Sequence, residues 1–111
     1  MNWINLTTKE QLEQIREKST EKPQVIFKHS TRCSISSMAK SRLERGNQPE
    51  GMDFYYLDLI AQRELSSTVA EDFAVSHESP QILIIKNGNC VYDASHSAIR
   101  LDDIANHALA T

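Results

Sequence analysis

Segments that favour strands and segments that favour helices alternate along this chain of 111 residues. Three short runs, residues 24–28, 52–60 and 81–86, are rich in aliphatic and aromatic side chains, as buried strands are. Stretches with apolar residues at helical spacing separate each run from the next. This alternation predicts helices packed against a central mixed sheet, the α/β class.

The complete expected order is β-α-β-α-β-α-β-β-α. Thr7 and Thr8 stand three residues before Glu10 and Gln11, and these two overlapping capping boxes predict a helix start. The pair Asn87-Gly88 predicts a hairpin. The expected strands lie near residues 3–6, 24–28, 52–60, 81–86 and 90–94, and the expected helices near residues 8–18, 34–45, 65–73 and 99–109.

Composition excludes several classes of protein. The net charge is −3, and no basic stripe with interleaved aromatic residues suggests a nucleic-acid partner. No apolar run reaches the length of a membrane span, and no secretory signal pattern opens the chain. Two cysteines argue against a disulfide scaffold. We therefore expect a single cytoplasmic domain over residues 1–111, with neither nucleic-acid nor membrane partners.

Cys33 lies where the strand near residues 24–28 turns into a helix. A thiol at a helix N-terminus faces unpaired backbone N–H groups and the positive end of the helix dipole, which favour the reactive thiolate. Ser36 occupies the position three residues on, where a dithiol oxidoreductase carries its second cysteine. An inert buried cysteine is the alternative, and the polar neighbours argue against it: Ser30, Thr31, Arg32, Ser34 and Ser36.

Three separated segments carry a resemblance to a known family: Cys33-Ser34-Ile35-Ser36, His77-Glu78-Ser79-Pro80-Gln81 and Ser95-His96. With the element order above, the chain resembles the thioredoxin fold over essentially its whole length. It resembles more closely the monothiol bacilliredoxin-like family of the bacillithiol system, whose members typically carry Thr-Cys-Pro-Ile-Ser, His-Glu-Ser-Pro-Gln and Ser-His. Two differences stand out, because Arg32 separates Thr31 from the cysteine and Ser34 replaces the proline.

The resemblance implies a monothiol thiol-disulfide oxidoreductase. Cys33 would remove a low-molecular-weight thiol, bacillithiol in this family, from mixed disulfides on proteins. Cys33 and Ser36 would be the catalytic residues, with the Ser36 hydroxyl donating a hydrogen bond to the sulfur. No bound cofactor is implied, the small thiol is a co-substrate, and the partners are S-thiolated proteins.

Six residues are candidate substrate contacts: Arg32, Ser34, Ser79, Pro80, Ser95 and His96. Arg32 would attract the malate carboxylates of bacillithiol, and the N–H of Ser34 would point at the sulfur. By analogy with thioredoxin-like proteins, Pro80 is expected to be cis and to hold the Ser79 backbone beside Cys33. Ser95 or Ser97 would equally well serve as a helix N-cap.

No second redox cysteine and no metal site is expected. The thioredoxin-like arrangement puts Cys90 about 20 Å from Cys33, too far for a disulfide, so the resolving thiol must come from outside. His77 and His96 match no compact zinc pattern, and we expect no metal site. Lys28 and His29 end a strand close to Cys33. Either residue could tune the pKa of its thiol, but exposure to solvent at a strand end explains both.

Three alternatives stay open. A glutaredoxin-like enzyme would run the same chemistry with glutathione. A non-catalytic thioredoxin-fold binding module would not depend on Cys33. A thiol redox sensor would react once at Cys33 without turnover, so reactivity separates these alternatives.

Overall fold

The computed structural model describes residues 1–110 and confirms the predicted order of elements. The strands are β1 (Trp3–Asn5), β2 (Gln24–His29), β3 (Asp53–Asp58), β4 (Gln81–Lys86) and β5 (Asn89–Ser95). The helices are α1 (Lys9–Lys18), α2 (Ser34–Arg45), α3 (Arg63–Asp72), the short 3-10 turn η1 (His96–Ala98) and α4 (Leu101–Leu109). No helix in this described part of the chain is long and apolar enough to cross a membrane.

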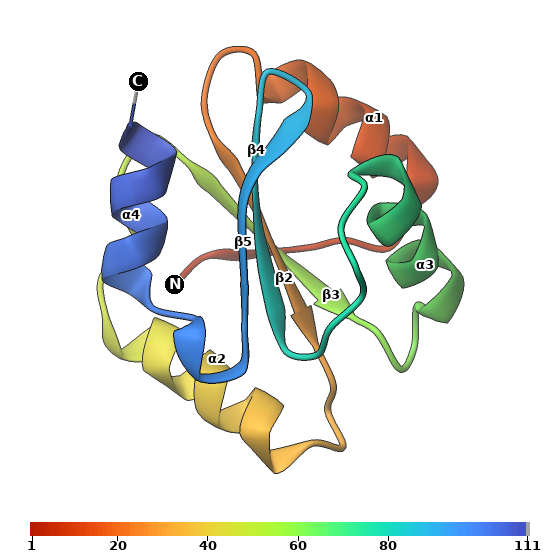
Figure 1. Ribbon diagram of the computed structural model, residues 1–111, viewed down its shortest axis with the longest axis vertical. Coiled ribbons are helices and arrows are strands. Elements are labelled where there is room, and N and C mark those ends of the chain that lie inside the picture. Colours follow the sequence, from red (N-terminus) through yellow and green to blue (C-terminus); the bar gives the residue numbers. More distant parts are fainter. Residues whose placement is uncertain (111) are drawn as a thin grey trace.

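The five strands form one mixed sheet in the order β1-β3-β2-β4-β5 (Figure 1). The central strand, β2, runs parallel to β3 and antiparallel to β4. β4 and β5 form the predicted hairpin, and both turn residues, Asn87 and Gly88, have the positive φ that such a two-residue turn requires.

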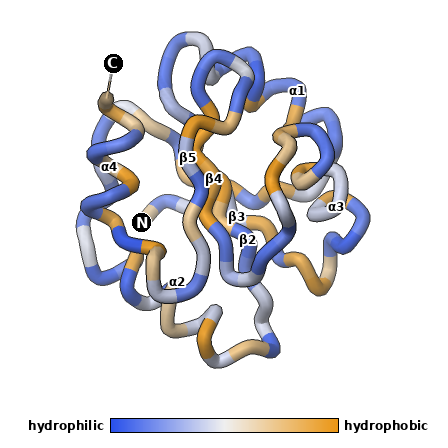
Figure 2. Tube along the Cα trace, in the orientation of Figure 1, coloured by the Kyte–Doolittle hydropathy of each residue, from blue (hydrophilic) through white to orange (hydrophobic). Residues whose placement is uncertain are grey.

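Helices cover both faces of the sheet. Figure 1 shows α1 and α3 on one side and α2 and α4 on the other. Successive residues of a strand point to opposite faces, so Val25 and Phe27 enter the core under α2 and α4, and Ile26 enters the core under α1 and α3. Figure 2 shows apolar residues gathered along the central strands. These strands are apolar without alternation because helices cover both faces of the sheet.

The third strand ends earlier than the sequence predicts. β3 stops at Asp58 instead of continuing to residue 60. The Asp58 carboxylate accepts hydrogen bonds from the backbone N–H groups of Ile60 and Ala61, at 3.0 and 3.3 Å. The side chain therefore competes with the sheet for the backbone and turns the chain toward α3.

The last helix starts later than expected. α4 begins at Leu101, with Arg100 as its N-cap, so Ile99 lies before the helix. Neither Ser95 nor Ser97 caps it. Ser95 ends β5 and precedes η1, whose backbone closes a turn from Ile99 N–H to the carbonyl of His96.

One edge of the sheet collects four segments that lie far apart in sequence. Lys28 pairs with Gln81, and Gln81 pairs with Ser95. The N–H of Leu59 donates to the carbonyl of His29 at 3.0 Å. The end of β2, the loop after β3, the start of β4 and the end of β5 therefore meet where α2 begins. The hairpin lies at the opposite end (Figure 1).

Of the two overlapping capping boxes, the structure forms the one on Thr8. Its hydroxyl accepts from the Gln11 N–H at 3.3 Å, and the Gln11 side chain accepts from the Thr8 N–H at 3.1 Å. We expect Thr8→Ala to lower the free energy of unfolding by about 1 kcal/mol in urea denaturation. Thr7→Ala is the matched control, since it keeps the backbone bond to Gln11, and equal losses would contradict this assignment.

Candidate active site

Cys33 is the N-cap of α2, as the sequence predicts. Its backbone is extended, its N–H donates to the carbonyl of Ser30, and its carbonyl accepts the first helical bond from Ser37. The thiol is free and partly exposed, and within residues 1–110 its side chain makes no capping hydrogen bond. Arg32 and Ser34, on either side, are exposed. The sulfur is thus open to an incoming disulfide at the start of a helix.

Ser36 points away from the sulfur. Its hydroxyl is fully buried, lies 2.7 Å from His29 Nδ1 and accepts from the Ser30 N–H at 3.0 Å. The expected hydrogen bond from Ser36 to Cys33 is absent from the described residues. The reason is that the buried imidazole and the loop N–H need partners, and Ser36 supplies both.

His29 is buried, which corrects the expectation of a solvated strand end. Its ring lies 5.7 Å from the Phe27 ring and 5.5 Å from the Tyr56 ring. Burial lowers the pKa of His29, and the charge of Lys40 lowers it further. The imidazole is therefore neutral at neutral pH, and the tautomer of its ring sets whether Nδ1 or the Ser36 hydroxyl donates the hydrogen bond between them.

Lys28 is also buried, on the opposite face of the sheet from His29. Burial lowers the pKa of its amine from 10.5 to about 8. Its Nζ lies 3.3 Å from Nδ1 of His77. Burial lowers the pKa of His77, and the charge of Lys28 lowers it further. At neutral pH this pair is an ammonium that donates to a neutral imidazole.

The Ser79–Pro80 peptide bond is cis, as the resemblance predicts. Pro80 is buried, and its carbonyl accepts from the His96 N–H at 3.2 Å. Ser79 is half-buried, and its hydroxyl has no partner in the described part of the chain. Backbone pairing therefore joins Pro80 to His96 and Gln81 to Ser95, so four of the predicted contact residues lie in two adjacent segments.

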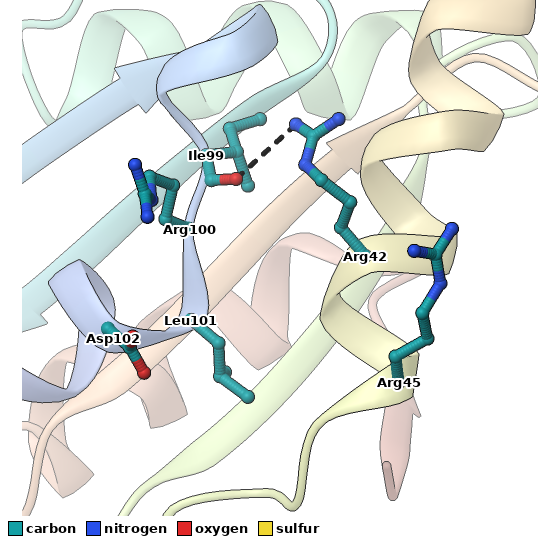
Figure 3. Close-up of a pocket in the computed structure, with 6 residues that line it drawn as sticks. All are labelled: Arg42, Arg45, Ile99, Arg100, Leu101 and Asp102. Atoms are coloured by element: carbon teal, nitrogen blue, oxygen red, sulfur yellow. Dashed lines mark hydrogen bonds between the residues drawn. The ribbon is translucent and has the colours of Figure 1, made fainter.

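His96 adopts a positive φ of 55°, which is uncommon for a residue other than glycine. Two bonds hold it there, from its own N–H to Pro80 and from Arg42 Nη2 to its carbonyl at 3.0 Å. Arg42 also reaches the carbonyl of Ile99 at 3.3 Å (Figure 3). Its side chain thus ties the segment after β5 to α2, while the His96 imidazole, 3.9 Å from Glu78, stays exposed.

Cys90 lies at the other end of the sheet. It pairs with Ile85, which pairs with Gln24 at the start of β2, whereas Cys33 follows the end of β2. The five steps along β2 from Gln24 to His29 span about 16 Å, so the two cysteines lie at opposite ends of this strand. Cys90 packs against the core under α1 and α3, and burial raises the pKa of its thiol. An internal disulfide, which needs Cα atoms within about 7 Å, does not fit this geometry.

The two histidines that the sequence pairs as candidate ligands have separate partners, Lys28 for His77 and Glu78 for His96. Across residues 1–110, no group of three or more His, Cys, Asp and Glu side chains is arranged to hold a metal ion.

Several residues of this edge are not identified by the sequence analysis. Arg42 and Lys28 carry a weak signal, because each places a charge at a position where its helix or strand is otherwise apolar. Nothing in the sequence indicates that His29 contacts Ser36 or that Lys28 contacts His77, since these pairs depend on the tertiary packing.

Ser36→Ala is expected to lower the free energy of unfolding by about 2 kcal/mol, because it leaves the buried His29 Nδ1 and the Ser30 N–H unpaired. Ser37→Ala, at an exposed position one residue on, is the matched control and should change stability little. Thermal or urea unfolding measures both. Equal stability of Ser36→Ala and wild type would contradict the buried hydrogen-bond pair.

Lys28→Met is expected to change how stability depends on pH. Between about pH 8 and 10.5 the unfolded chain holds the Lys28 proton and the folded chain does not, so wild-type stability rises with pH. The unfolding free energy of the wild type minus that of Lys28→Met should therefore rise with pH over this range, by about 3 kcal/mol at most. Urea unfolding at several pH values measures it, with exposed Lys9→Met as control. A constant difference would rule out the buried amine.

Comparison with known proteins agrees with this geometry. The family model of the monothiol bacilliredoxin BrxC matches residues 4–104. A solved thioredoxin-fold protein provisionally assigned as an oxidoreductase is 34% identical, with 94% of this chain and 91% of that chain covered and a TM-score of 0.82.

Two thioredoxins share the fold at lower identity. That of Malassezia sympodialis is 18% identical, with 98% and 92% of the two chains covered and a TM-score of 0.78. That of Trypanosoma brucei brucei is 15% identical, with 95% and 92% covered and a TM-score of 0.74. The predicted thioredoxin-like fold is confirmed, and the chain belongs to the monothiol bacilliredoxin BrxC family of thioredoxin-fold oxidoreductases.

Proposed function

We propose that this protein removes a small thiol from mixed disulfides on other proteins, with Cys33 as its single reactive thiol. The observation that carries the proposal is the placement of the two cysteines. Cys33 is partly exposed at the start of α2, and Cys90 is at the far end of the sheet. The helix N-terminus favours a thiolate at Cys33, and no second thiol of the chain can reach it.

The reaction proceeds by two thiol–disulfide exchanges. The Cys33 thiolate attacks the small-thiol sulfur of the mixed disulfide, a new S–S bond forms, and the bond to the target protein breaks. The target leaves as a thiolate and takes a proton from solvent. A second small thiol, as its thiolate, then attacks the small-thiol sulfur on Cys33, releases the small-thiol disulfide and restores the Cys33 thiolate.

The other predicted site residues have distinct roles in this proposal. Arg32 and Ser34 are exposed next to the sulfur and would contact the small thiol. Ser79, Pro80, Ser95 and His96 would form the opposite wall of the site, in the two segments that backbone pairing joins. Ser36 acts as a positioning residue, because it holds the loop before Cys33 through Ser30.

Membership of the BrxC family favours bacillithiol as the small thiol and S-bacillithiolated proteins as substrates. A cytoplasmic location fits this proposal, because glutathione-like small thiols keep cysteines reduced in that compartment. The proposed reaction needs no bound cofactor, since the small thiol supplies the electrons.

Mass spectrometry after incubation with a bacillithiolated protein tests the proposal. We expect bacillithiol to appear on Cys33, to be released by free bacillithiol, and to be absent in Cys33→Ser. Cys90→Ser, the matched control, should transfer it like wild type. Faster transfer from a glutathionylated protein would assign a glutaredoxin-like activity. A single reaction without release would indicate a sensor, and no adduct on folded, reduced protein would contradict catalysis.

A further inference from the structure

A pocket, called the second pocket here to distinguish it from the surface around Cys33, opens between α3 and the loop that precedes β4. It has a volume of about 230 Å³, and its lining residues are Leu59, Arg63, Ser66, Ser67 and His77. Leu59 is hydrogen-bonded to His29 at the end of β2, and His77 lies three residues before Pro80. The pocket therefore lies at the end of β2, on the side of the sheet away from α2, and Cys33 starts α2 at the same edge.

Positive charge gathers at this pocket. Arg63 lines it directly, and behind His77 lies the buried ammonium of Lys28, 3.3 Å from Nδ1 of the imidazole. Since Lys28 donates to Nδ1, the neutral imidazole carries its own proton on Nε2 and offers it as a further donor. Among the described residues, the lining includes no carboxylate. The Glu78 carboxylate lies 3.9 Å from the His96 imidazole, and although its charge raises the pKa of His77, burial and Lys28 keep that pKa lowered.

The first turn of α3 adds backbone donors. Gln62, the N-cap, makes no side-chain capping bond within the described residues, and the helix begins at Arg63 in the pocket wall. The first N–H groups of a helix lack intrahelical partners, and the helix dipole favours a negative charge beside them. A helix N-terminus of this kind binds anions such as carboxylates and phosphates.

Ser66 supplies an independent indication of a ligand. The residue is only 3% exposed, it lines the pocket, and its hydroxyl has no hydrogen-bond partner in residues 1–110. Buried hydroxyls without partners are uncommon because leaving them unpaired is unfavourable. An acceptor oxygen placed in the pocket would satisfy this hydroxyl together with Arg63.

We propose that this pocket is a carboxylate subsite that binds the negatively charged end of the small thiol while its sulfur reacts at Cys33. The inference rests on the proposed function and deepens it, because it assigns the part of the small thiol that carries no sulfur. The malate group of bacillithiol, with its carboxylates, has the required chemistry, so this pocket replaces Arg32 as the proposed contact for those carboxylates.

The arginine-lined pocket between α2 and α4 is a weaker candidate for the same role. Arg42, Arg45 and Arg100 line it, but Arg42 already donates to backbone carbonyls and the Asp102 carboxylate shares the lining (Figure 3). Arg45 is the last residue of α2, twelve residues from Cys33. It therefore provides a matched control.

The test compares two mixed disulfides of one reporter peptide, one with bacillithiol and one with uncharged 2-mercaptoethanol. We expect Arg63→Gln to reduce kcat/KM for the bacillithiol adduct about tenfold more than for the 2-mercaptoethanol adduct, since it removes a charge-assisted hydrogen bond. Ser66→Ala should shift the ratio in the same direction and by less, and Arg45→Gln should leave it unchanged. An unchanged ratio in Arg63→Gln, with turnover intact, would overturn the subsite alone.

A binding measurement separates the subsite from catalysis. In an NMR titration of the wild type with sodium L-malate, the amides of Arg63, Leu65 and Ser66 should shift and saturate, and they should not do so in Arg63→Gln. Sodium chloride at equal ionic strength is the control. If neither adduct is turned over, the proposed function fails, and the titration still decides on the pocket. Absence of any malate-specific shift in the wild type would overturn the carboxylate subsite.

Discussion

The burial of β2 between two helical layers is the constraint on which the rest of the structure depends. Its six residues are all buried, and alternate side chains enter opposite cores. Because the strand is fixed on both sides, the place where it ends is fixed too. Cys33 follows four residues after this end, and the turn from Ser30 to Cys33 starts α2 there. The position of the thiol is thus a consequence of core packing.

The last two residues of β2, Lys28 and His29, are polar and buried, and each has a different hydrogen-bond partner. His29, on the side of α2, shares a hydrogen bond with Ser36 and holds the loop that carries Cys33. Lys28, on the side of α3, contacts His77 at the rim of the second pocket. Buried polar groups of this kind are stable only when they have partners. Both partners come from segments next to the proposed reaction site, so the same contacts that satisfy β2 also shape that site.

The two sides of the site are joined by backbone more than by side chains. Pro80 and His96 are connected through a carbonyl and an N–H, and Arg42 binds the carbonyls after β5. The segment after β5 is therefore tied both to the start of β4 and to α2, whereas Arg32, Ser34 and the His96 imidazole remain exposed.

The sequence by itself determined the order of elements, the hairpin and the position of Cys33 at the start of α2. These features follow from apolar patterning, turn residues and strand length, which are local properties. Only the tertiary structure decided that Ser36 binds His29 instead of the sulfur, and that Lys28 is buried beside His77. Such contacts join segments that are distant in sequence, and their partners are chosen by which buried polar groups would otherwise remain unpaired. The end of β3 and the start of α4 differ from the prediction for a related reason. The first is set by hydrogen bonds to the Asp58 carboxylate and the second by the backbone bond of the η1 turn, and no change in apolar pattern marks either.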